Sequence, residues 1–317
     1  MMDWTDRHCR VLHRVFTRNA RLYTEMLTAS AIIHGDRARL LAFIPAEHPL
    51  ALQLGGADPT ALAEAARIGE DLGFDEINLN VGCPSDRVQG GAFGACLMRQ
   101  PALVAECMAA IRAAVRIPAT VKCRLGVDEQ DPDESLFELV DLSAAAGVTT
   151  FIVHARKAWL EGLSPKENRE VPPLDYAIVR RLKRERPELS VIINGGVESL
   201  DEALRHLETV DGVMLGRAAY HTPEILGEAD RRLFDAAAPT VSSMEAVERY
   251  LPYVRAELAK GTRLAAMTRH MLGLFHGVPG ARAWRRGLTT EAVRVGAGVE
   301  VIERALEAVT ARALETA

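Results

Sequence analysis

Short apolar runs alternate with amphipathic stretches along most of the chain. From Leu50 to Gly216, each apolar run is followed by a stretch with apolar residues three and four positions apart. That spacing predicts helices, and the short runs between them predict buried strands. The alternation is typical of repeated βα units around a parallel sheet. The predicted strands are Leu22–Leu27, Leu50–Leu54, Glu76–Val81, Ala119–Leu125, Thr149–His154, Ser190–Ile193 and Gly212–Leu215.

The predicted helices complete the α/β pattern of a TIM barrel. They cover Asp6–Thr17, Pro59–Leu72, Pro101–Val115, Glu134–Ala146 and Leu174–Arg186. A closed (β/α)8 barrel needs eight strands, and the pattern predicts seven. The only free place for another strand is before Leu22, yet Met1 opens almost directly onto a loop and a helix. We therefore expect a (β/α)8 barrel whose first strand is truncated.

The strand pattern stops after Gly227. Three helices are predicted in the last part of the chain, over Met244–Lys260, Arg263–His276 and Glu291–Leu314. A stretch of small residues with a proline, 235–240, separates them from the βα units, as expected at a joint between domains. The sequence thus predicts a barrel domain over 1–235 and a helical domain over 241–317.

Composition narrows the class of protein. The 317 residues exceed the roughly 250 of one barrel, and no apolar stretch approaches a membrane span. The first residues lack the apolar core of a secretory signal, so a cytoplasmic protein is expected. Five cysteines without a C-x-x-C pair argue against a disulfide framework and a zinc site, and no metal is expected. The net charge of −5 means that any RNA contact must be a local basic patch.

Polar side chains stand at the C-terminal ends of six predicted strands. In a barrel this is the end at which the active site is built. Any one of them alone is more often a solvated rim residue, but their joint occurrence predicts a site. The residues are Gln53, Asn78, Asn80, Lys122, Arg124, His154, Arg156, Asn194 and Arg217.

Two of these ends combine glycine with polar residues. Asn194-Gly195-Gly196 and Gly216-Arg217 lie where barrels commonly bind a phosphate on backbone N–H groups. Such a site suits a nucleotide cofactor or a phosphorylated metabolite. Lys122 and His154 would stabilise negative charge beside it, either on a flavin or on an enolate.

Cys83 follows the predicted strand Glu76–Val81 and precedes a proline. A thiol on a loop over the end of the barrel can act as a general acid if it reaches the substrate. The alternative is a half-buried thiol that packs as a small apolar side chain.

Several segments together resemble the tRNA-dihydrouridine synthases. They cover nearly the whole chain, and the last two resemble the A subfamily in particular. The segments are 52–56, 78–88 with its Gly-Cys-Pro-Ser, 91–98, 121–124, 154–159, 194–196, 216–217, 163–170 and 279–286.

The resemblance implies an enzyme that uses FMN and NADPH to reduce uridines 20 and 20a in the D-loop of tRNA. Cys83 would be the proton donor. The residues implied in FMN binding are Met1 and Met2, as the remainder of a Pro-Met-Met segment, with Gln53, Lys122, His154, Asn194, Gly195, Gly196, Gly216 and Arg217. The residues implied in tRNA binding, at the D-loop and elbow, are Asn80, Lys166, Arg169, Arg282 and Arg285.

Two alternatives remain open at this point. A flavin barrel that reduces a free pyrimidine, as dihydroorotate dehydrogenases do, would use the same flavin residues but leaves the helical domain without a role. A tRNA-binding protein without catalysis is suggested by the missing first strand. The basic residues of Leu174–Arg186 are interpreted as one solvated helix face rather than an RNA contact.

Overall fold

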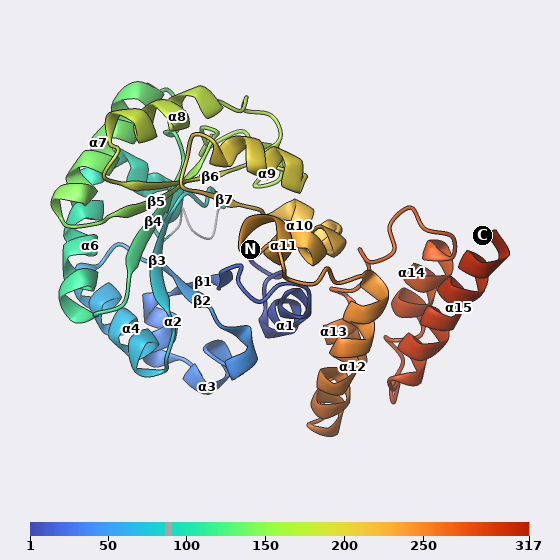
Figure 1. Cartoon of the computed structure of the whole chain (residues 1–317). Helices are drawn as coiled ribbons and strands as arrows, with labels where there is room; N and C mark the ends of the chain where they lie inside the picture. The colour runs from blue at the N-terminus through green and yellow to red at the C-terminus, as the bar shows by residue number, and fades with distance from the viewer. Residues whose placement is uncertain (86–90, 317) are drawn as a thin grey trace. The chain divides into compact units, whose positions relative to one another are not determined.

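The computed structural model describes residues 1–85 and 91–316. Within these residues, seven parallel strands form one sheet in the order of the sequence (Figure 1). The strands are β1 (Leu22–Thr28), β2 (Leu50–Gly55), β3 (Glu76–Val81), β4 (Ala119–Cys123), β5 (Thr150–His154), β6 (Ser190–Asn194) and β7 (Gly212–Met214). All seven predicted strands are confirmed, and the sheet is that of a (β/α) barrel. Among the described residues, no strand precedes β1.

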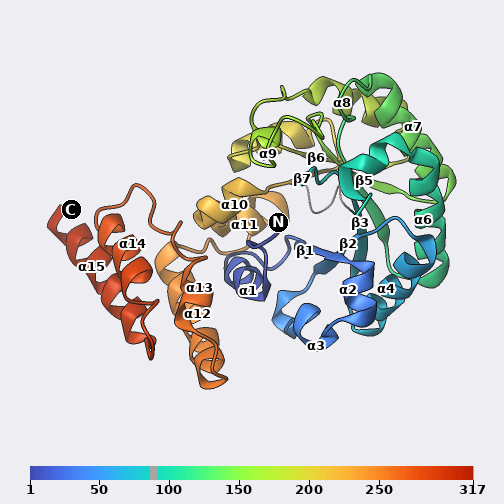
Figure 2. The same cartoon turned by 180° about the vertical axis from the view of Figure 1, so that it is seen from behind.

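Helices pack along the outer side of this sheet, as both views show (Figures 1 and 2). Most of them begin where the sequence supplies a capping side chain. Asp58 accepts hydrogen bonds from the backbone of Thr60 and Ala61, and Pro59 takes the first helical position. The helices are α2 (Ala29–His34), α3 (Arg37–Leu40), α4 (Pro59–Asp71), α6 (Pro101–Ala114), α7 (Pro132–Ala145), α8 (Tyr176–Glu185) and α9 (Leu200–Leu207), with 3₁₀ turns η2 (Gly94–Arg99) and η3 (Glu167–Arg169).

The chain divides into two compact units. The first contains Met1, Arg21–Ile44 and His48–Gly216, and the second contains Met2–Ala20, Pro45–Glu47 and Arg217–Ala317. The second unit comprises α1 (Arg7–Phe16), η1 (Pro45–Glu47), α10 (Arg217–His221), η4 (Pro223–Glu228), α11 (Ala229–Leu233), α12 (Ser243–Ala259), α13 (Leu264–Thr268), α14 (Ala281–Thr290) and α15 (Glu300–Thr316).

These units differ from the domain boundary at 235–241, which stays a prediction. The helix α1 belongs to the second unit because its apolar face packs against α12 and η4. Leu12 and Phe16 are buried on that face. A buried ion pair between Arg10 and Glu47 ties η1 to the same helix.

Two predicted helices are shorter than expected. The predicted Arg263–His276 helix ends at Thr268 as α13, and Phe275 and Gly277 have positive φ angles that a helix does not allow. The predicted Glu291–Leu314 helix begins only at Glu300 as α15, since Gly296 has a φ of 78° in the preceding loop. Both differences arise from chain reversals that apolar spacing does not reveal. No helix in the described part of the chain is long and apolar enough to cross a membrane.

The register of neighbouring strands places their polar residues at the same height along the strand direction. Every residue of β3 is buried, as expected for a parallel strand covered on both faces. Asn78 pairs with Gln53 on one side and with Thr120 on the other, and Asn80 pairs with Lys122. These levels position the candidate site at the C-terminal end of the sheet.

Candidate active site

Lys122, His154 and Asn194 come from three neighbouring strands and meet at the C-terminal end of the sheet. Lys122 Nζ donates to Asn194 Oδ1 at 3.0 Å, and Asn194 Nδ2 donates to the carbonyl of Met214 at 2.7 Å. His154 pairs with Asn194 in the register of β5 and β6. The structure therefore brings together three residues that the sequence predicts for the cofactor.

The charge around these residues is positive. Burial, followed by the neighbouring Arg124, lowers the pKa of Lys122 to about 8. Burial also lowers the pKa of His154 well below its usual range, and the positive charges of Arg124 and Lys122 add to this. At neutral pH Lys122 is mostly protonated and His154 is neutral. The pair can stabilise an anion or hydrogen-bond a carbonyl oxygen.

The Gly195-Gly196 turn lies directly against His154. Its φ angles are 107° and 73°, a region that other residues rarely adopt. A Cβ atom on Gly195 would lie 2.4 Å from Cδ2 of His154, and one on Gly196 would lie 2.5 Å from Cδ1 of Leu174. The Tyr176 hydroxyl donates to the Gly195 carbonyl at 2.7 Å. The glycines thus form a closely packed turn beside two basic side chains, a donor set that fits an anionic phosphate-bearing cofactor.

Cys83 lies on the loop after β3 and is half-buried. We call the described residues that follow the strand, 82–85, the Cys83 loop. Its backbone N–H donates to Asn80 Oδ1 at 2.9 Å, and its carbonyl accepts from the backbone of Ala95 at 2.9 Å. Its Sγ is 3.5 Å from the hydroxyl oxygen of Ser85. The thiol is therefore held at a defined place. The last residues of the 78–88 motif, from 86 onward, lie outside the described residues.

Asn80 and Gln53 bond to each other. Asn80 Nδ2 donates to Gln53 Oε1 at 2.9 Å, while Asn80 Oδ1 accepts from the Cys83 loop. Gln53 Nε2 donates to Asn78 at 2.8 Å. Both amides thus support the Cys83 loop. The RNA contact of Asn80 and the FMN contact of Gln53 stay predictions.

Arg124 is a residue whose role the sequence did not reveal. It is buried, and its guanidinium donates to the carbonyls of Gly82, Lys157 and Asn168 at 3.0, 3.0 and 2.8 Å. Asn168, also buried, accepts from the backbone of Trp159 at 2.7 Å. Arg124 therefore joins the Cys83 loop to the long loop after β5. Its alternation with Thr120 and Lys122 along β4 is the signal that places it on the inner face.

The predicted Met1, Met2, Gly216 and Arg217 are divided between the units. Met1 and Gly216 lie together in the first unit, since Sδ of Met1 is 3.7 Å from a Cβ built on Gly216. Met2 and Arg217 belong to the second unit, and Met2 is exposed. The structure therefore brings Met1 next to one predicted cofactor residue. The roles of all four stay predictions.

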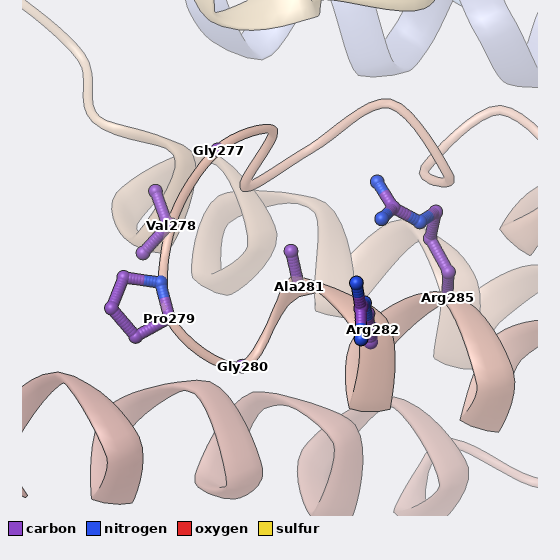
Figure 3. A pocket seen from close by; sticks show the side chains of 7 residues that line it. All are labelled: Gly277, Val278, Pro279, Gly280, Ala281, Arg282 and Arg285. Carbon is purple, nitrogen blue, oxygen red and sulfur yellow. The ribbon is translucent and has the colours of Figure 1, made fainter.

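The four basic residues predicted to bind RNA lie on two surfaces. Lys166 is exposed immediately before η3, and Arg169 ends that turn. Arg282 and Arg285 are exposed on α14 in the second unit. Figure 3 shows them at an open hollow of about 310 Å³, whose other wall is the loop Gly277–Gly280.

Comparisons with known proteins identify the family of this chain. Residues 1–311 match the family model described as "Dihydrouridine synthase (Dus)". Proteins named "tRNA-dihydrouridine(20/20a) synthase" are 61% identical in Xanthomonas axonopodis pv. citri (strain 306), over 97% of this chain and 91% of that protein, and 55% identical in Escherichia coli (strain K12), over 98% and 90%.

A solved structure of morphinone reductase has a similar fold. The TM-score is 0.51 at 13% sequence identity, and the match covers 75% of this chain and 83% of that one. This likeness supports the barrel class alone. The family model and the close relatives, which span almost the whole chain, decide the family: the chain belongs to the dihydrouridine synthases.

Proposed function

We propose that this protein is a tRNA-dihydrouridine synthase, which reduces the C5=C6 bond of uracil in tRNA. The observation that supports the proposal is that the Cys83 loop and the cluster of Lys122, Asn194 and the Gly195-Gly196 turn lie at the same end of the sheet. Asn80, which holds the Cys83 loop, lies beside Lys122 in the register of β3 and β4. Lys122 in turn contacts Asn194, next to the Gly195-Gly196 turn. A potential acid and an anion-binding cradle are therefore neighbours.

FMN is the cofactor that we propose for this cradle, with NADPH as the electron donor. Lys122, His154, Asn194 and the Gly195-Gly196 turn would hold it, with Gln53, Met1, Met2, Gly216 and Arg217 as further contacts. When bound, FMN supplies the hydride that adds to C6 of the base.

Cys83 would complete the reduction by giving its proton to C5, so that the π bond between C5 and C6 is replaced by two C–H bonds. The resulting thiolate regains a proton from solvent. A thiol suits this role because its proton is largely present near neutral pH and is only weakly held. The protonated Lys122 would stabilise negative charge on the cofactor or the base.

A uridine in folded RNA reaches such a site only if it is turned out of its stack. Asn80 is proposed to contact the base, and Lys166 and Arg169 the adjoining RNA. Arg282 and Arg285 are proposed to contact tRNA phosphates from the helical unit, because no acidic side chain pairs with either one in the described residues. The D-loop uridines 20 and 20a are the proposed targets. We propose that the protein acts in the cytoplasm.

The visible absorption spectrum of the purified protein tests this proposal. We expect flavin bands that bleach on anaerobic addition of NADPH and return on addition of unmodified tRNA. Mass spectrometry of the digested tRNA should then detect dihydrouridine at positions 20 and 20a.

A Cys83→Ala variant separates the roles within the site. It should keep the flavin bands and their bleaching by NADPH but form no dihydrouridine. Equal loss of bound FMN would mean that Cys83 is structural. Turnover of free uracil or orotate would favour the free-pyrimidine reductase, and tRNA binding by a protein that takes up no FMN would favour the non-catalytic alternative.

A further inference from the structure

Three polar residues alternate along the buried strand β3. Glu76, Asn78 and Asn80 are separated by Ile77 and Leu79, so they point to the same face of the sheet. Their exposed fractions are 2%, 0% and 9%. Buried polar groups require hydrogen-bond partners, because an unpaired one is costly. Each of the three finds a partner on a neighbouring strand.

Three hydrogen bonds connect Glu76 to Gln53 of β2 through Thr120 and Asn78. The Thr120 hydroxyl donates to Glu76 Oε1 at 2.7 Å and accepts from Asn78 Nδ2 at 2.8 Å. Asn78 Oδ1 accepts from Gln53 Nε2 at 2.8 Å. Thr120 and Asn78 thus each accept on one side and donate on the other, whereas Glu76 only accepts.

Further hydrogen bonds with the same donor-to-acceptor direction connect Gln53 to the Cys83 loop through Asn80. Gln53 Oε1 accepts from Asn80 Nδ2 at 2.9 Å. Asn80 Oδ1 accepts from the backbone N–H groups of Gly82 and Cys83 at 3.0 and 2.9 Å. We call the five side chains that form this continuous chain of bonds, Glu76, Thr120, Asn78, Gln53 and Asn80, the polar ladder.

Glu76 is the fixed end of the polar ladder. It also accepts from the guanidinium of Arg21 and from the Tyr23 hydroxyl, the latter at 2.9 Å. Burial and the neighbouring Glu76 carboxylate raise the pKa of Tyr23, so its hydroxyl keeps its proton. Both of these groups, the guanidinium and the hydroxyl, donate to Glu76, and a carboxylate paired with a guanidinium acts as an acceptor only. Thr120 must therefore donate to Glu76, which leaves its oxygen to accept from Asn78.

This constraint passes from one side chain to the next. An amide side chain can be placed with its oxygen and nitrogen exchanged, unless its neighbours require one orientation. Because Thr120 accepts, Asn78 must present its NH₂ group to Thr120 and its oxygen to Gln53. The same reasoning orients Gln53 and then Asn80. Only this orientation presents an oxygen to the N–H groups of the Cys83 loop.

We propose that Glu76, acting through Thr120 and Asn78, is a positioning residue that fixes the orientation of the polar ladder and so the place of the Cys83 loop. The consequence for the reaction rests on the proposed function, in which Cys83 donates a proton. The effect on the loop itself does not, so the two can be tested separately.

The experiment compares Thr120→Val with Thr120→Ser in the full-length protein as purified. Valine has the shape of threonine without its hydroxyl and interrupts the polar ladder, whereas serine retains the hydroxyl. The readout is the rate at which iodoacetamide alkylates Cys83, followed by peptide mass spectrometry without RNA or NADPH. Cys96, which is also half-buried but outside the polar ladder, is the internal reference.

Thr120→Val removes two buried hydrogen bonds, one to Glu76 and one from Asn78. It should accelerate alkylation of Cys83 relative to Cys96 by about fivefold or more, because the orientation of Asn78 is no longer determined by its neighbour. Thr120→Ser should restore the original rate. Tyr23→Phe is a second control, because it removes a bond to Glu76 without interrupting the polar ladder. It should leave the Cys83 rate unchanged even if the protein becomes less stable.

An unchanged Cys83 rate in a folded Thr120→Val protein would overturn the proposal. So would equal acceleration by Tyr23→Phe, since general loss of polar bonding would then explain both. If Thr120→Val does not fold, Glu76→Gln provides the test, because its amide permits both orientations and should give a smaller acceleration of the same sign. A lack of dihydrouridine formation in the unsubstituted protein would refute the proposed function and leave the alkylation result standing.

Discussion

The helices α8 and α14 both carry several basic side chains, but they differ in how many of these side chains have an acidic partner. On α8, Arg181 bonds to both carboxylate oxygens of Asp133, and Lys183 contacts Asp211 at 2.9 Å. Arg186, just after α8, bonds to both oxygens of Asp141 at 2.7 and 2.8 Å. Three of the five basic side chains of this region are thus paired with acidic residues of the same unit, whereas Arg180 and Arg184 form no ion pair in the described residues.

The helix α14 has the opposite arrangement. Arg282 and Arg285 are exposed one turn apart, and no ion pair to either is found among the described residues. The other side of α14 is firmly anchored: Trp284 is buried, and its indole N–H donates to the carbonyl of Met271 at 2.9 Å. A Cβ atom on Gly280 would lie 2.7 Å from Cα of Val309 in α15, so glycine is required for this packing.

The comparison shows that the number of basic residues does not identify an RNA surface. Counting charges along the sequence gives α8 at least as strong a claim as α14. The difference is the presence of acidic partners beside Arg181 and Lys183, which reduce the local field of α8. Free arginines on a rigid helix retain the field that attracts phosphates. We therefore expect tRNA affinity to depend on α14 and to be insensitive to α8.

The largest effect is expected when both free arginines of α14 are removed. Arg282→Ala with Arg285→Ala should weaken binding of unmodified tRNA by about tenfold or more at moderate salt, since two charge-assisted contacts are lost. Fluorescence anisotropy with labelled tRNA measures the Kd. The matched control is Arg181→Ala with Arg186→Ala, which removes the same charge from α8 and the residue that follows it. Equal weakening by both pairs would remove the distinction between the helices.

A smaller loss of tRNA affinity is expected when Arg285 of α14 is given an acidic neighbour, as Arg181 of α8 has. Thr289 is exposed and lies four residues after Arg285, the spacing at which side chains on a helix interact. Thr289→Glu should weaken tRNA binding by about threefold, because the new carboxylate pairs with Arg285 and repels phosphate. Thr289→Gln, of similar size but uncharged, should bind as the original protein does. Equal Kd values for the two variants would contradict the electrostatic explanation.

The salt dependence of tRNA binding should distinguish an arginine that contacts a phosphate from one that does not. Arg282→Ala should reduce the slope of log Kd against log salt concentration by about 1, because one fewer phosphate is neutralised. Arg186→Ala should leave the slope unchanged. A slope that does not respond to Arg282 would mean that this side chain does not contact a phosphate.

The smallest effect concerns stability. Asp141→Ala should lower the midpoint of thermal unfolding by only about 1–2 °C, since exposed ion pairs contribute little. Its tRNA affinity should not change. Differential scanning calorimetry gives the midpoint. A loss of tRNA binding in this variant would show that the α7–α8 surface has a role beyond stability.

Local pattern was sufficient to predict most of the fold. The strands were predicted because a buried parallel strand is a short, mainly apolar run, and helices such as α4 because an Asp-Pro cap precedes apolar residues at helical spacing. The segments 263–276 and 291–314 were predicted less well. There the chain turns through residues of positive φ, and the apolar positions that follow a turn continue the same apparent period.

The sequence could predict which residues form the candidate site, because they stand at the C-terminal ends of the predicted strands. Lys122 and Asn194 were expected to meet because parallel strands end at the same edge, and the structure places them 3.0 Å apart. The supporting residues could not be predicted in the same way. Arg124 joins loops that are more than 40 residues apart in sequence, and nothing near it in the chain marks its partners.

The sequence by itself determined the family, the barrel and the residues at its C-terminal end, because these depend on local composition and on motifs that can be recognised along the chain. Only the tertiary structure decided how those residues are bonded. The direction of the polar ladder from Glu76 to Cys83, and the pairing of α8 but not of Arg282 and Arg285 on α14, depend on which side chains of distant segments come within hydrogen-bond distance. That distance is a property of the folded chain and is not encoded in the spacing of residues along it.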